Sequence, residues 1–165
     1  MTLNFRLAAR GLIIDDDGCL LLVRLVFPDG AFWVLPGGGI DTGEDVKDAL
    51  YRELREETGL VEPIIGPHVW NRLHEFDLVD TDGVQWQGQR ESVFLIQTQR
   101  FAVSPLLTSQ ELLAENLHEH RWWSVDEIAS YIGSDKFAPR DIHSLVREIL
   151  ENGPPDVPFE IHQVN

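Results

Sequence analysis

Residues Gly38 to Leu60 read Gly-Gly-Ile-Asp-Thr-Gly-Glu-Asp-Val-Lys-Asp-Ala-Leu-Tyr-Arg-Glu-Leu-Arg-Glu-Glu-Thr-Gly-Leu. This stretch predicts a helix from about Asp45 to Thr58, which Gly59 would end as a left-handed cap. The apolar residues of the predicted helix recur at spacings of three and four along one face, as expected for a helix that packs against a core. They are Val46, Ala49, Leu50 and Leu54.

Three acids continue the same face toward the end of the predicted helix. At ~100° per residue, the side chains of Glu53, Glu56 and Glu57 project within roughly a 100° sector. Carboxylates held this close and partly desolvated repel one another by several kcal/mol unless a cation lies between them. Because hard divalent cations such as Mg²⁺ prefer carboxylate oxygens, the spacing predicts a metal site of the kind that acts on phosphates.

The length and composition indicate one folded domain, residues 1–165. A chain of 165 residues can bury one ordinary core, and 43% hydrophobic with 25% charged residues is typical of a globular protein. The formal net charge of -15 argues against duplex nucleic acid as a partner, since that binding needs a broad basic face. A small anionic substrate remains compatible, because a bound metal and a few arginines can reverse the local potential.

The cysteine and hydropathy patterns bear on the location of the protein. Cys19 is the only cysteine, which excludes an internal disulfide and a cysteine-based metal site, and favours a reducing cytoplasm. No apolar run approaches the ~18 residues that a membrane span needs, so we expect no membrane partner. A homodimer remains an open alternative.

The rest of the chain predicts an α/β domain in which helices pack against a mixed sheet. Beside the helix quoted above, we expect a short helix over 125–131 and a last helix over 139–151 that Gly153-Pro154-Pro155 ends, leaving a proline-containing tail, residues 153–165. Residues 100–116 are ambiguous, part loop and part polar helix. Six extended segments are expected, at 5–14, 19–27, 32–35, 61–79, 84–98 and 118–124.

The glycines and acids of the quoted stretch have a long and specific spacing. Gly38, Glu44 and the run from Arg52 to Leu60 resemble the Nudix box at every fixed position. Looser similarity extends to Trp33-Val34-Leu35-Pro36 and to Trp122-Trp123-Ser124-Val125-Asp126-Glu127-Ile128. The resemblance implies an α/β/α sandwich with a mixed β-sheet and a loop-helix-loop catalytic motif. It also implies hydrolysis of a nucleoside diphosphate linked to another group.

The candidate metal and catalytic residues lie within this stretch. Glu53, Glu56 and Glu57 are the predicted oxygen ligands of Mg²⁺, for which Mn²⁺ could substitute. Gly38 joins the predicted metal site, because glycine lets a ligand approach the backbone closely. Arg52 is predicted to brace Glu56 four residues later. The four predicted catalytic residues are Arg52, Glu53, Glu56 and Glu57.

The proton acceptor of the reaction stays open at this point. Glu56 and Glu57 are the candidates inside the quoted stretch, and a glutamate of a later loop is the alternative. Glu115 and Glu119 are the candidates for that later residue.

The predicted substrate contacts lie outside the quoted stretch and rest on residue type. Arginines on strands could contact phosphate, and exposed tryptophans could stack a base. The candidates are Arg10, Arg24, Arg90, Trp70 and Trp86, whereas Trp33 and Trp122 are expected in the core.

Family subgroups carry markers near the box, and these narrow the substrate by elimination. A proline marks ADP-ribose hydrolases about fifteen residues past the box, where this chain has His74-Glu75-Phe76. Phe76 is aromatic but lacks the hydroxyl of the tyrosine that marks dinucleoside polyphosphate hydrolases, and the coenzyme A pattern is absent. A nucleoside triphosphate or related nucleotide is therefore the expected small-molecule substrate. The alternatives are dinucleoside polyphosphates, nucleotide sugars or ADP-ribose, and a catalytically silent nucleotide-sensing module.

Overall fold

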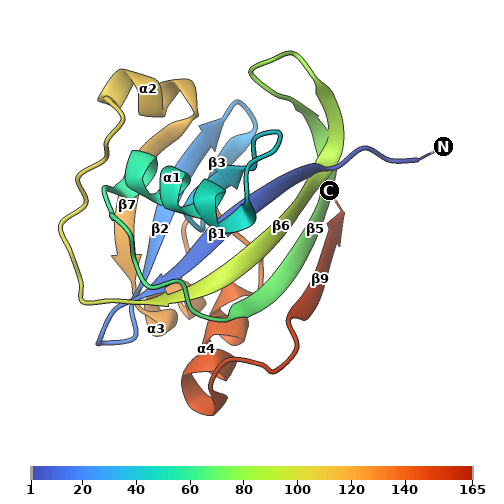
Figure 1. The fold of residues 1–165 in the computed structure, drawn as a ribbon. Helices are drawn as coiled ribbons and strands as arrows, with labels where there is room; N and C mark the ends of the chain where they lie inside the picture. Colours follow the sequence, from blue (N-terminus) through green and yellow to red (C-terminus); the bar gives the residue numbers. More distant parts are fainter. Residues whose placement is uncertain (1, 165) are drawn as a thin grey trace.

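The computed structural model describes residues 2–164, whose strands join into one mixed sheet (Figure 1). The elements in chain order are β1 (Arg6–Ile14), β2 (Leu20–Phe27), β3 (Gly30–Val34), β4 (Gly37–Gly39), α1 (Val46–Thr58), β5 (His68–Val79), β6 (Gln85–Gln97), α2 (Ser109–Ala114), β7 (Leu117–Trp123), α3 (Val125–Ala129), β8 (Lys136–Ala138), α4 (Ile142–Asn152) and β9 (Phe159–Val164).

The sheet has the strand order β8-β3-β2-β1-β6-β5-β9, with β4 paired to β1 and β7 paired to β2. Strands β1 and β6 run parallel at its centre, as do β5 and β9 and also β3 and β8 toward its edges. The remaining pairs are antiparallel. The mixed sheet predicted from the sequence is therefore confirmed.

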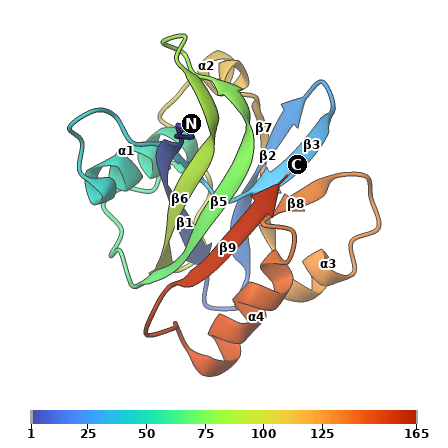
Figure 2. The ribbon, with the colours of Figure 1, turned by 90° about the vertical axis from the view of Figure 1, so that its right-hand side faces the viewer.

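Helices cover both faces of the sheet, which gives the α/β/α sandwich that the resemblance implied (Figure 2). Leu50 and Leu54 of α1 pack on one face, against Ala9, Ile13, Leu21 and Ile96. Helices α3 and α4 cover the opposite face through Ile128, Ile142, Val146 and Ile149. No helix in residues 2–164 is long and apolar enough to cross a membrane.

Helix α1 forms where the sequence predicts it. The Asp45 side chain accepts a hydrogen bond from the Lys47 backbone N–H at 2.9 Å, which caps the first turn. Gly59 ends the helix with φ 80, the left-handed region that glycine adopts without strain. The capping residues thus fix the boundaries of the helix that carries the acids.

The structure differs from the sequence prediction mainly at short strands. Gly37–Gly39, which lie outside the expected extended segments, form the short strand β4, because their backbone pairs with β1. Strand β5 begins at His68 rather than at residue 61. The segment 100–116 contains α2, whose Thr108 and Glu111 form a reciprocal capping box.

Two further strands were not predicted, and both lie at the edges of the sheet. Strand β8 is only three residues long, and β9 lies in the proline-containing tail, residues 153–165. Each pairs with a strand far away along the chain, β3 and β5 respectively. Such pairing leaves no signal in the local sequence, because the partner strand supplies the hydrogen bonds.

Candidate active site

The glycine strand β4 lies against the acidic end of α1. Gly38 is paired with Ala9 of β1, and a Cβ atom at position 38 would lie 2.7 Å from the carboxyl carbon of Glu53. That distance is shorter than real Cβ contacts allow. Only a glycine at position 38 therefore lets the Glu53 carboxylate rest on the backbone of β4.

Glu57 is buried at the same place, with 6% of its surface exposed. Its Oε2 atom accepts a hydrogen bond from the Gly37 backbone N–H at 3.0 Å. Burial, followed by repulsion from Glu53, raises the pKa of Glu57 to about 8, although the Gly37 N–H and Arg10 act in the opposite direction. Glu57 is therefore a carboxyl group whose charge is poorly compensated by the protein alone.

Arg52 connects the acids of α1 to the preceding loop. Its Nη1 donates to Glu53 Oε1 at 2.9 Å and to Glu56 Oε2 at 3.5 Å. Its Nε and Nη2 bind both oxygens of Glu44 at 3.0 and 2.9 Å, and Nη2 also donates to the Gly39 carbonyl at 3.0 Å. The sequence predicted only the link to Glu56, which is the longest of these hydrogen bonds.

The same hydrogen bonds leave one oxygen of each predicted ligand uncommitted. Within residues 2–164, Glu53 Oε2, Glu56 Oε1 and Glu57 Oε1 accept no hydrogen bond. Burial raises the pKa of Glu53, an effect that Arg52 partly offsets and that repulsion from Glu56 reinforces. Three such carboxylates fit a hard divalent cation by their donor chemistry.

The carboxylates do not yet form a closed cage. Within the described chain, no group of three or more acidic, histidine or cysteine side chains converges closely enough to hold a metal ion. The reason is that Arg52 draws Glu53 and Glu56 to one side while the Gly37 N–H holds Glu57. Rotation of these side chains would be needed for all three to share one ion, so their role as ligands stays a prediction.

Glu115 is the later-loop glutamate that lies near these acids. It caps the end of α2, and the charges of Glu53, Glu56 and Glu57 all interact with it. Although Glu115 keeps an exposed surface, packing around its carboxyl group and repulsion from Glu56 raise its pKa. Glu119, the other candidate, lies on β7 opposite Arg24.

Two of the three arginines predicted to contact phosphate are held in ion pairs. Arg10 Nε binds Glu91 Oε1 at 2.8 Å, and its Nη1 donates to the Leu35 carbonyl at 2.9 Å. Arg24 binds both oxygens of Asp135, at 2.8 and 3.2 Å. A phosphate contact by either would require breaking these bonds, whereas Arg90 is exposed on β6.

The predicted base contact by Trp70 is corrected by the structure. Trp70 has no exposed surface and lies in the core cluster on the α3 and α4 face, so its ring has no face to offer a ligand. Trp86 is half-buried on β6, with its indole N–H donating to Asp80 at 2.8 Å. Trp33 is buried as expected, and Trp122 is half-buried.

Arg6 is a cation near the site that the sequence gave no reason to select. Its guanidinium lies so close to Gly39 that any side chain at position 39 would overlap it. Within residues 2–164 no hydrogen bond or ion pair engages this guanidinium, although Glu115 and Asp80 lie within electrostatic reach. Arg6 lies far outside the box, in the extended segment that the sequence predicted over residues 5–14.

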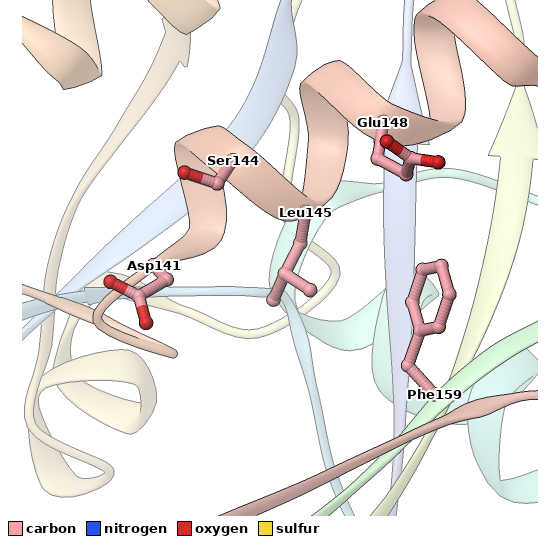
Figure 3. Close-up of a pocket in the computed structure, with 5 residues that line it drawn as sticks. All are labelled: Asp141, Ser144, Leu145, Glu148 and Phe159. Atoms are coloured by element: carbon pink, nitrogen blue, oxygen red, sulfur yellow. The ribbon is translucent and has the colours of Figure 1, made fainter.

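Of two surface cavities formed by the described residues, one adjoins α1. A cavity of about 320 Å³ is lined by Tyr51, Arg52, Arg55, Glu56, Val61, Glu62 and Leu106. The other, of about 420 Å³, lies between α4 and β9 and is lined by Asp141, Ser144, Leu145, Glu148 and Phe159 (Figure 3). The second cavity contacts none of the acids of α1.

Comparison with known proteins agrees with the fold and the box. The chain is 48% identical over 50 residues to the nucleoside triphosphatase NudI of Salmonella heidelberg (strain SL476), a match that covers 28% of this chain and 36% of that protein. The chain thus spans about a third of the length of the curated relatives it matches.

Solved structures show the same fold at low sequence identity. The MutT protein of Methanosarcina mazei Go1 superposes with a TM-score of 0.60 at 18% identity, over 92% of this chain and 96% of that chain. The NUDIX domain of Shewanella oneidensis NrtR, solved in complex with ADP ribose, gives a TM-score of 0.63 at 19% identity, over 91% and 90% of the two chains. The family model for the NUDIX domain matches residues 4–146, and the chain therefore belongs to the Nudix family.

Proposed function

We propose that this protein is a Mg²⁺-dependent hydrolase that cleaves a phosphoanhydride bond in a nucleoside triphosphate. The observation that carries the proposal is Glu57, a buried carboxyl group with a raised pKa, held by the Gly37 N–H beside Glu53. A strongly perturbed carboxyl group beside a second acid is the arrangement expected at a catalytic metal site. The partial similarity to a nucleoside triphosphatase favours a triphosphate as the substrate.

Each residue of the site has a defined task in this proposal. Glu53, Glu56 and Glu57 would hold the cation, since Arg52 and Gly37 leave one oxygen of each uncommitted. When bound, Mg²⁺ neutralises part of the phosphate charge and lowers the pKa of the attacking water. Arg52 braces Glu53 and Glu56 through one oxygen of each, and both side chains would rotate about this contact to share an ion with Glu57.

The proton released by the attacking water needs an acceptor that is free to take it. Glu56 and Glu57 remain candidates, but both are held by hydrogen bonds from Arg52 or Gly37. We favour Glu115, because no hydrogen bond to its side chain is present in the described residues and burial and Glu56 raise its pKa, which makes it a stronger base than an ordinary carboxylate.

The phosphates also need a cation from the protein. Arg10 and Arg24 neutralise Glu91 and Asp135, so Arg6 is the better candidate for a direct phosphate contact. We expect Arg6→Gln to raise KM for the nucleotide roughly tenfold, a loss typical of one charge-assisted hydrogen bond. The exposed Arg140→Gln is the matched control and should leave KM unchanged.

The proposed function is tested by turnover of a substrate panel with Mg²⁺ and with EDTA, with products resolved by chromatography. The panel contains canonical and oxidised nucleoside triphosphates, ADP-ribose, nucleotide sugars and dinucleoside polyphosphates. We expect hydrolysis of a triphosphate that EDTA abolishes and that Glu57→Gln lowers by at least ~100-fold, while Glu151→Gln on the exposed end of α4 has no effect. Wild-type protein that turns over none of the panel would refute the proposal.

The panel also separates the alternative functions. Preferential hydrolysis of ADP-ribose would favour the alternative of an ADP-ribose hydrolase. ADP ribose is the ligand in the solved complex of the NrtR NUDIX domain. Preferential hydrolysis of a dinucleoside polyphosphate would favour the alternative of a dinucleoside polyphosphate hydrolase. Nucleotide binding without any product would identify a sensing module instead.

A further inference from the structure

A buried network of charges lies beside the glycine strand, and neither the box nor the proposed function accounts for it. Glu91 of β6 is 5% exposed and lies between two arginines from neighbouring strands. Its Oε1 binds Arg10 Nε at 2.8 Å, and its Oε2 binds Arg72 Nη1 at 3.3 Å. Burying charges is costly unless each is paired, so the geometry of these bonds is closely constrained.

Arg10 connects this network to the backbone of β4. While Nε binds Glu91, Nη1 donates to the carbonyl oxygens of Leu35 and Gly37, at 2.9 and 3.3 Å. The Gly37 N–H in turn donates to Glu57 Oε2 at 3.0 Å. Both polar groups of the Gly37 residue are therefore engaged, its carbonyl by Arg10 and its N–H by Glu57.

The backbone at this position depends on such support. Gly37 has φ 139, a conformation that other residues rarely adopt, and a side chain there would overlap the Ala9 carbonyl. A glycine has many alternative conformations once its hydrogen bonds are lost. The orientation of the Gly37 N–H is therefore set by its bond to Glu57, by the Arg10 bond to its carbonyl and by the pairing of β4 with β1, rather than by its own conformational preference.

We propose that Glu91 is a positioning residue for Glu57, acting through Arg10 and the Gly37 backbone. Glu91 fixes the Arg10 guanidinium, Arg10 fixes the carbonyls of residues 35 and 37, and the Gly37 N–H then fixes one oxygen of Glu57. The proposal rests on the proposed function in so far as Glu57 is taken to act at the metal site.

Arg10 itself shows why this anchor matters. Its charge interacts with Glu57 and Glu53 as well as with Glu91. Without Glu91, the guanidinium would gain most by turning toward those two acids, where it would compete with a metal ion. Glu91 thus holds a cation close enough to support the glycine strand but away from the carboxylates of α1.

Arg72 provides a matched control for the network. It also binds Glu91, but its Nε donates to Gln163 of β9 at 2.8 Å, and it forms no bond to the backbone of β4 among the described residues. Arg72→Met therefore removes an ion pair to the same carboxylate without touching Arg10 or Gly37. A purely stabilising role for Glu91 predicts similar effects of Glu91→Gln and Arg72→Met, whereas a positioning role predicts different ones.

The first test observes the Gly37 amide directly by ¹H–¹⁵N NMR of the metal-free protein, without substrate. In the wild type we expect a downfield amide proton that exchanges slowly with solvent. Glu91→Gln should move it upfield and speed its exchange roughly tenfold or more, the effect of weakening one hydrogen bond to a carboxylate. Arg72→Met should leave the Gly37 amide where it is. An unchanged Gly37 amide in Glu91→Gln, or an equal change in Arg72→Met, overturns the proposal.

The second test follows turnover of the triphosphate identified by the panel, at equal folded fractions. Glu91→Gln should lower kcat roughly ten- to a hundredfold with little change in KM, and Arg72→Met should retain wild-type kcat. Adding Glu91→Gln to Arg10→Met should cause no further loss, because the two residues act in series. Additive losses overturn the proposal.

The tests still decide the role of Glu91 if the Glu91→Gln variant does not fold or if the wild type has no activity. If Glu91→Gln does not fold, the Arg10→Lys variant is used instead, because lysine keeps the charge next to Glu91 but cannot bind both carbonyls. We expect the same upfield shift and faster exchange of the Gly37 amide in this variant. An unchanged Gly37 amide overturns the proposal. If the wild type turns over nothing, the proposed function fails, yet the NMR test still decides whether Glu91 positions Glu57.

Discussion

Glu57 illustrates how much a single buried charge costs at the residue scale. Its carboxyl group is almost fully buried beside Glu53, and its pKa is raised to about 8. In the unfolded chain the same group ionises near pH 4.5. Folding without a metal therefore favours the protonated form, and the ionised form lowers the stability of the folded state.

The sign of this effect predicts how stability depends on pH. Between about pH 4.5 and about pH 8 the folded state holds a proton that the unfolded state has released, so the stability contributed by Glu57 falls as pH rises. Each pKa unit corresponds to about 1.4 kcal/mol. In EDTA, Glu57→Gln should match the wild type near pH 5 and unfold with a free energy several kcal/mol higher at pH 9, as measured by urea denaturation.

The control for this prediction is Glu151→Gln, which removes an exposed acid of α4. It should change the free energy of unfolding little, and equally at both pH values. A gain in Glu57→Gln that is the same at pH 5 and pH 9 would contradict the account of Glu57 as a buried, poorly compensated acid.

Residue type and spacing identified the acids of the site, but not which arginine is free of an ion pair and could contact a phosphate. Glu53, Glu56 and Glu57 follow from helical spacing, and their positions on α1 depend only on local structure. Which arginine remains available to a phosphate depends on ion pairs such as Arg10 with Glu91, whose members are 81 residues apart. Spacing along the chain carries no information on such pairs, so Arg6 was missed.

At the scale of elements, α1 and β4 form one unit. The glycines of β4 let the helix approach so closely that Glu53 rests on Gly38 and Arg52 reaches the Gly39 carbonyl. The loop between them is held by Glu44, which binds Arg52. The hydrogen bonds from Arg52 are the main reason that the pKa of Glu44 is lowered. The acids are thus positioned by a strand that was not among the segments predicted from the sequence.

This close approach predicts the effect of one methyl group. Gly38→Ala should displace the Glu53 carboxylate, because the new Cβ would lie 2.7 Å from its carboxyl carbon. We expect Mn²⁺ binding, measured by electron paramagnetic resonance, to weaken at least ~10-fold, as is typical when a ligand is mispositioned. The fold should persist by circular dichroism.

Gly18→Ala is the matched control for this variant. Gly18 lies in the β1–β2 turn and, unlike Gly38, occupies the left-handed region with φ 78, and a Cβ added there would meet only Leu150 methyl groups, the nearest at 3.6 Å. It should lose some stability through strain and keep its Mn²⁺ affinity. Equal Mn²⁺ affinity in Gly38→Ala and wild type would argue against a metal site at β4.

At the scale of the whole molecule, the sheet gathers distant parts of the chain. Strand β9 pairs with β5 in parallel, and its Phe159 and Ile161 pack against the core cluster on the α4 face. Arg72 of β5 donates to Gln163 of β9. The tail thereby covers one edge of the sheet and contacts the same charge network that supports the site.

The organisation as a single domain, which stays a prediction, can be tested by calorimetry. The full chain should unfold in one transition whose calorimetric and van't Hoff enthalpies agree. Deletion of residues 153–165 should lower Tm by several degrees, because it exposes the edge of β5 and removes two partly buried apolar side chains. Two separate transitions in the full chain, or an unchanged Tm after the deletion, would contradict this view.

The sequence by itself determined helix α1, the Gly59 cap at its end, its acids and the family. Those features depend on contacts between residues a few positions apart, which spacing reveals. Only the tertiary structure decided that Trp70 is core, that the tail forms β9, and that Glu91 holds Arg10 beneath the glycine strand. These depend on pairing between strands far apart in the chain, and the physical reason is that burial and charge compensation are set by the neighbours that folding brings together.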